Sequence, residues 1–199
     1  MSDDYELAKL IVSGATGIFA IAGGTVTVVN FLRTTRWKRA ELANEYLEDL
    51  TSNAELVFAS RALDWGGGRL VVPEMLRPIL DDGHGAPVDR IEHDPEVMEA
   101  AMVAGLLTDA VRADPRLQVY RTALDSLLSW LSLIRQALDR RLFAPADVEA
   151  LRYWLRKIGD ADWLHGFIRD FGYARDMRAL ARHFDEPVLG AAFARDAAA

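Results

Sequence analysis

A run of 23 residues, Leu10 to Leu32, contains no charged side chain, and four basic residues, Arg33, Arg36, Lys38 and Arg39, follow it. As an α-helix this run would be roughly 34 Å long, against a hydrocarbon core of about 30 Å. Eleven of its residues are Leu, Ile, Val or Phe, which favour insertion, and its four glycines and hydroxyl side chains oppose it. The run therefore predicts a single transmembrane helix over residues 10–32.

The charges on either side of this run predict its orientation. Residues 1–9 hold three acids and one lysine, a net charge of −2, whereas the exit is strongly basic. By the positive-inside tendency, residues 1–9 form a short extracytoplasmic tail and the C-terminal part is cytoplasmic. A basic juxtamembrane helix is expected over 33–50. The group expected at the membrane interface, with the lipid bilayer as its partner, consists of Arg33, Arg36, Trp37, Lys38 and Arg39.

Small side chains recur within the uncharged run at steps of three and four residues. This spacing places them on one face of a helix, where helix backbones in lipid can approach closely. Small residues are also common in spanning helices generally. Two interpretations therefore stay open: a surface for helix association, or the ordinary composition of a spanning helix. Under the first, the anchor self-associates or pairs with another helix through this stripe, which comprises Ser13, Gly17, Ala20, Gly24 and Thr27.

The same run offers an alternative, because Val12 to Ala20 resembles the glycine-rich turn of dinucleotide-binding dehydrogenases. That turn requires a preceding strand, a following helix and an acidic residue about twenty positions on. Here Gly23 and Gly24 would interrupt the helix, and basic residues stand where the acid is needed. A soluble nucleotide-binding enzyme is the weaker alternative.

The rest of the chain is acidic, free of cysteine and rich in helix formers. The whole chain carries −7, so after the −2 tail and the +4 exit cluster, residues 40–199 carry −9. An acidic body argues against nucleic acid as a partner. The absence of cysteine excludes disulfides and thiol nucleophiles. We therefore expect an all-α fold, with a helical cytoplasmic domain of five to six helices over 51–185 and a flexible tail over 186–199.

Capping signals place the expected helices. Thr51 or Ser52 should begin one helix, and Asp94 and Asp114 each precede a proline, the arrangement of a helix start. Further helices are expected from Ala144, from Asp160 and over 173–184. The longest helix, about 115–141, has a broad apolar face typical of the centre of a bundle. Its seam runs through Leu117, Tyr120, Leu124, Leu127, Leu131, Ile134 and Leu138.

Between residues 66 and 94 the chain is rich in glycine and proline, which predicts a long irregular loop with a short strand near 69–72. Loops of this length are often functional. The weak candidates for a site on it are Trp65, Arg69, His84, His93 and Asp94. No histidine pair has metal-ligand spacing, and no phosphate loop or nucleophile elbow is present, so we expect no catalytic, metal or cofactor residues.

Four features follow one another along the chain: the uncharged run, the basic exit around Trp37, the Asp64-Trp65 turn, and the block Tyr120–Leu138 followed by Tyr153-Trp154-Leu155. This order resembles uncharacterised bacterial single-pass, membrane-anchored helical proteins. The resemblance implies a helical domain tethered to the bacterial inner membrane, and it implies no active site. The function expected is a cytoplasmic interaction, sensor or scaffold module, with a protein partner or a second copy of itself. The alternative is a membrane-anchored enzyme with a site on the 66–94 loop.

Overall fold

The computed structural model describes residues 34–81, 88–103 and 114–193. The predicted transmembrane helix with its stripe of small residues, Arg33 and His84 lie outside these ranges. Among the helices that the structure describes, none combines the length and the apolar character needed to cross a bilayer. The chain divides into two compact units, Met1–Glu41 and Leu42–Ala199. Residues 34–52 are helical, so the boundary falls within the helix that was expected over 33–50.

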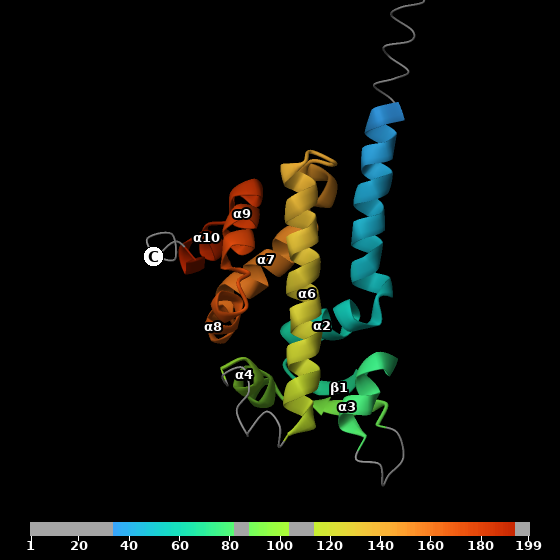
Figure 1. The fold of residues 1–199 in the computed structure, drawn as a ribbon, viewed down its shortest axis with the longest axis vertical. Coiled ribbons are helices and arrows are strands. Elements are labelled where there is room, and N and C mark those ends of the chain that lie inside the picture. Colours follow the sequence, from blue (N-terminus) through green and yellow to red (C-terminus); the bar gives the residue numbers. More distant parts are fainter. Residues whose placement is uncertain (1–33, 82–87, 104–113, 194–199) are drawn as a thin grey trace, which may run out of the picture. The chain divides into compact units, whose positions relative to one another are not determined.

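The second unit is built around one long helix, α6 (Pro115–Asp139). Figure 1 shows α6 at the centre of the helices of this unit. Every residue of the predicted seam is buried, from Leu117 at 8% exposure to Leu131 and Ile134 at 0%. Asp114 caps the helix by accepting a hydrogen bond from the Arg116 amide at 2.9 Å. The sequence-based placement of a central bundle helix is confirmed.

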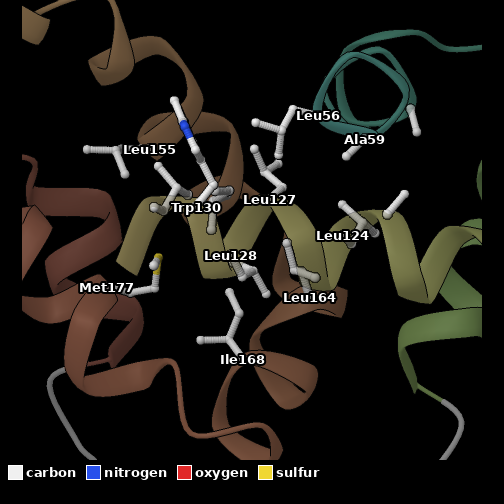
Figure 2. Packing of buried hydrophobic residues seen from close by; sticks show 14 of the residues in the cluster. Leu56, Ala59, Leu124, Leu127, Leu128, Trp130, Leu155, Leu164, Ile168 and Met177 are labelled. Atoms are coloured by element: carbon white, nitrogen blue, oxygen red, sulfur yellow. The ribbon is translucent and has the colours of Figure 1, made fainter. Parts of the chain in front are cut away.

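Several other helices contribute to the hydrophobic core around α6. They are α2 (Ala54–Asp64), α4 (Pro95–Val103), α7 (Leu151–Asp160), α8 (Asp162–Asp170) and α9 (Ala174–Phe184). Figure 2 shows Leu124, Leu127, Leu128 and Trp130 of α6 beside side chains of these helices. Those side chains are Leu56 and Ala59 of α2, Leu155 of α7, Leu164 and Ile168 of α8, and Met177 of α9.

The fold is mostly helical, as expected, but the 66–94 segment is more ordered than its composition indicated. It contains a two-stranded antiparallel sheet, β1 (Gly68–Val71) and β2 (Arg90–His93), with Leu70 opposite Ile91. Between the strands lie a 3-10 turn, Glu74–Leu76, and the short helix α3 (Arg77–Leu80). This sheet is the only one in the described ranges, and the parallel sheet of a dinucleotide-binding fold does not occur there.

Several predicted helix boundaries differ from the structure. Asn53, and not Thr51 or Ser52, caps α2, because its side chain accepts from the Glu55 and Leu56 amides. The helix expected from Ala144 divides into a 3-10 turn, Pro145–Val148, and α7. Asp160 is the last residue of α7 and does not cap α8.

A further helix, α10 (Pro187–Phe193), occupies the first part of the segment expected to be a flexible tail. Its Leu189 and Phe193 are both 0% exposed, so packing fixes this helix in spite of its alanine-rich sequence. Within residues 51–185, where five or six helices were expected, the described ranges hold seven helices from α2 to α9, and α10 follows beyond residue 185. The additional segments are short ones that lack a long amphipathic pattern.

Candidate functional site

The α9 and α10 helices lie next to each other (Figure 1). Residues of both helices and of the tight turn between them line a groove of 450 Å³. Arg175, Arg178 and Arg182 of α9 line it, together with Asp185, Glu186 and Gly190. The three arginines are separated by three and four residues, so one helical face presents all of them to the same space. Three guanidinium groups on one wall make this groove the strongest candidate site.

The arginines of the groove lack the carboxylate partners that the α7 arginines have. Arg152 pairs with Glu149 at 2.6 Å, and Arg156 lies 3.5 Å from Glu186. Within the described ranges, Arg175 and Arg182 have neither a hydrogen bond nor an ion pair. Arg178 makes one long hydrogen bond, 3.5 Å from its Nη1 to the Phe193 carbonyl. The donors of these side chains are thus available to a ligand.

Two carboxylates stand at the turn between α9 and α10. Asp185 is exposed and adopts a left-handed backbone, with φ 50°, which ends α9. Glu186 is 3% exposed, and its Oε2 atom accepts no hydrogen bond within the described structure, although the Arg156 guanidinium is near. The groove therefore has a cationic wall along α9 and an anionic corner at the turn.

Polar contacts with α6 hold α9 in place. The Tyr173 hydroxyl donates to Asp125 at 2.7 Å and accepts from Ser129 at 2.7 Å. Burial raises the pKa of the Tyr173 phenol above its usual value, so it stays a donor at neutral pH. This arrangement fixes the first turn of α9 and so the direction in which its arginines project.

Two further contacts tie α9 to α6, one in its first turn through Asp176 and one in its last turn through His183. Arg135 of α6 lies 3.2 Å from Asp176, and the His183 ring lies 2.9 Å from Asp139. Hydrogen bonds from His183, and then from Arg135, lower the pKa of the Asp139 carboxyl. The wall of the groove is thus tied to the central helix at both of its ends.

Two of the predicted loop candidates, His93 and Asp94, make hydrogen bonds within the fold. His93 is 4% exposed, and its two ring nitrogens lie 2.9 Å from the Tyr120 hydroxyl and from the Trp65 carbonyl. A carbonyl can only accept, so Nε2 carries the proton and Nδ1 accepts from Tyr120. Asp94 caps α4 by accepting from the Glu96 amide at 3.0 Å. These contacts join the sheet to α6.

The other two described loop candidates, Arg69 and Trp65, are exposed. Arg69 faces Glu92 across the sheet at 3.4 Å, with both side chains more than 70% exposed. The Trp65 ring is 42% exposed and stacks under Arg61. The structure brings His93 and Trp65 together and leaves Arg69 on the surface. The described ranges contain no group of three or more acidic or histidine side chains arranged to hold a metal ion.

Of the residues expected at the membrane interface, the described ones are Arg36, Trp37, Lys38 and Arg39, and all four are exposed. The Trp37 side chain is 69% exposed, an uncommon state for an indole facing water. This exposure is compatible with an interfacial position, where the ring would sit among headgroups.

The groove was not predicted from the sequence. The spacing of Arg175, Arg178 and Arg182 and the two acids after them were visible in the sequence. Such a pattern also describes an ordinary solvated helix face. Only the packing of α10 beside α9 turns it into the wall of a groove, and α10 was not predicted.

The fold and this groove define a mostly helical domain with a small antiparallel sheet and a cationic groove near its C-terminus. No protein-family model matches the chain, and neither a curated protein nor a solved structure matches it.

Proposed function

We propose that this chain is a membrane-tethered sensor module whose helical domain binds a small anionic ligand in the groove between α9 and α10. The observation that carries the proposal is the set of three arginines on one wall, of which Arg175 and Arg182 have no partner within the described ranges. Planar guanidinium groups bind carboxylates and phosphates in two-pronged geometry, which a single lysine cannot match.

The charge of the surrounding domain supports this assignment. Residues 40–199 carry a net charge of −9, so a cationic groove stands out from its acidic background. A non-specific polyanion such as nucleic acid would be repelled by most of the surface, while a small anion need only enter the groove. The expected ligand is accordingly small and carries one or more acid groups.

The tether in this proposal is the uncharged run Leu10–Leu32, followed by the basic exit. The proposal places the helical domain in the cytoplasm of a bacterial cell, attached to the inner membrane. Self-association through the stripe Ser13, Gly17, Ala20, Gly24 and Thr27 would let ligand binding act on a dimer or on a partner helix. Carbonate extraction of native membranes tests the tether: release of the chain without detergent would contradict it.

Calorimetry on the full chain in detergent micelles, with inorganic phosphate and glutarate as probes, tests the binding half of the proposal. The double variant Arg175→Gln and Arg182→Gln should bind either probe at least about tenfold more weakly, since hydrogen bonds to charged groups contribute roughly 1.5–3 kcal/mol each. The charge-matched control is Arg90→Gln with Arg140→Gln, two exposed arginines outside the groove. Equal binding by both double variants would contradict the proposed site.

A further inference from the structure

We infer that the ligand of this groove is a small zwitterion, with its acid groups on the arginines of α9 and an ammonium group on Asp185. This inference rests on the proposed function, and it concerns the chemical class of the ligand. It starts from the unequal distribution of charge in the groove, where arginines line α9 and carboxylates stand at the turn.

The spacing along α9 fits a ligand with separate charges. Arg175 and Arg182 are seven residues apart, which is about 10 Å along a helix. Asp185 follows Arg182 by less than one turn. A molecule of five or six heavy atoms in a chain can therefore place an acid group on Arg182 or Arg178 while its amine reaches Asp185.

The Asp185 carboxylate is the accessible acceptor at this corner. It is exposed, and within the described ranges its side chain has no hydrogen bond or ion pair. Glu186 beside it is buried and lies 3.5 Å from the Arg156 guanidinium, which offsets its negative charge, so Asp185 is the carboxylate that an ammonium group would meet. A simple anion would be repelled at this corner.

The charge balance of the groove favours an amino acid with a second acid group. Three arginines and two carboxylates give the lining a net charge of +1. L-Glutamate carries two carboxylates and one ammonium group, a net charge of −1 at neutral pH, and each of its charged groups finds an opposite charge in the groove. The volume of 450 Å³ exceeds what such a ligand requires, which leaves space for water.

The test compares L-glutamate with glutarate, which keeps both carboxylates and lacks the amine. Calorimetry on the full chain in detergent micelles should show L-glutamate binding roughly 10- to 100-fold more tightly, the range expected for one hydrogen bond between charged groups. The variant Asp185→Asn should remove this preference, because asparagine keeps the shape of the side chain and loses its charge.

Asparagine is a suitable replacement because it tolerates the left-handed backbone found at Asp185, so the turn should be retained. An unchanged thermal unfolding midpoint would verify this. Asp170→Asn, at an exposed acid in another part of the fold, serves as the control with the same loss of charge and should keep the preference for L-glutamate.

The remaining outcomes separate the two proposals. Equal binding of L-glutamate and glutarate, or an equal loss of both in Asp185→Asn, would overturn the zwitterion inference and leave the anion site standing. If L-glutamate, glutarate and phosphate all fail to bind, the proposed function itself is contradicted.

Discussion

Gly159 of α7 lies so close to Leu189 of α10 that a Cβ atom on the glycine would stand 2.9 Å from the Leu189 amide nitrogen. The same Cβ would meet Val188 Cγ1 at 3.1 Å. Only a residue without a side chain lets α10 pack at this distance, and α10 forms one side of the groove. The position of the site therefore depends on a glycine outside it.

The first prediction follows from this contact. Gly159→Ala should destabilise the fold by about 1–3 kcal/mol, because backbone and not a flexible side chain meets the new methyl group. Gly166→Ala in α8 is the matched control, since nothing lies within 4 Å of its added Cβ. That control should be stabilised by roughly 0.5–1 kcal/mol, the usual gain of alanine over glycine in a helix. Urea unfolding measures both, and equal stabilities would show that α10 moves freely away from α7.

The second prediction concerns the buried contacts of Tyr120. Its hydroxyl donates to His93 Nδ1, and Tyr120→Phe would leave this buried ring nitrogen without its partner. We expect a loss of about 1–3 kcal/mol in the free energy of unfolding. Tyr153→Phe removes a hydroxyl that bonds to Asp64 from a side chain that is 49% exposed, so it should change stability much less. A Tyr120→Phe variant as stable as the control would show that His93 finds other partners.

The third prediction links the attachment of α9 to ligand binding. Tyr173→Phe keeps the ring and removes its hydrogen bonds to Asp125 and Ser129, so stability should fall by about 1–2 kcal/mol. Because these contacts orient α9, glutarate binding should weaken as well. Tyr46→Phe is the control: the Tyr46 ring packs against Phe143, and no hydrogen bond of its hydroxyl occurs in the described structure. Calorimetry that finds unchanged glutarate affinity in Tyr173→Phe would remove this link.

The fourth prediction is a pH dependence at the contact between α2 and α7. A hydrogen bond from Tyr153, and then one from Lys157, lowers the pKa of the Asp64 carboxyl below its ordinary 3.8. The bond to Asp64 in turn raises the pKa of Lys157 above 10.5. The stabilisation by Asp64 is therefore present above pH 3.8 and is lost as pH falls through the lowered pKa. That by Lys157 is present below pH 10.5 and is lost as pH rises through the raised pKa.

Asp64→Asn tests this window. The difference in unfolding free energy between the natural chain and the variant should be small, about 0.5 kcal/mol, because Asp64 and Lys157 are both about one-third exposed. It should stay constant between pH 5 and 9 and shrink at both extremes. Urea unfolding across this range measures it, and a difference that grows toward low pH would reverse the assigned sign.

The sequence predicts the centre of this fold well and its periphery less well. The α6 seam could be recognised because its apolar residues repeat over 25 positions, and tertiary contacts agree with that repeat. Asp94 and Asp114 mark helix starts through local chemistry, which does not depend on distant residues. In contrast, β2 has only four residues and α10 only seven, too few for a period to be visible.

The groove could not be predicted because its walls become neighbours only after folding. Pro187 and the alanines around residue 191 indicate a frayed end in the sequence, and burial of Leu189 and Phe193 overrides that local tendency. His93 was predicted as a loop histidine open to ligands. It is buried because Tyr120, 27 positions away, supplies the partner that makes burial of an imidazole favourable.

The length of α6 has a consequence for how the second unit would respond to the proposed ligand. The helix contacts α2, α3 and α4 as well as α9, so the sheet region and the groove share one structural support. If both regions open only together with α6, binding in the groove lowers the population of every open state by the same factor. Amide hydrogens of β1 and β2, far from the bound molecule in sequence, would then exchange with deuterium more slowly in its presence.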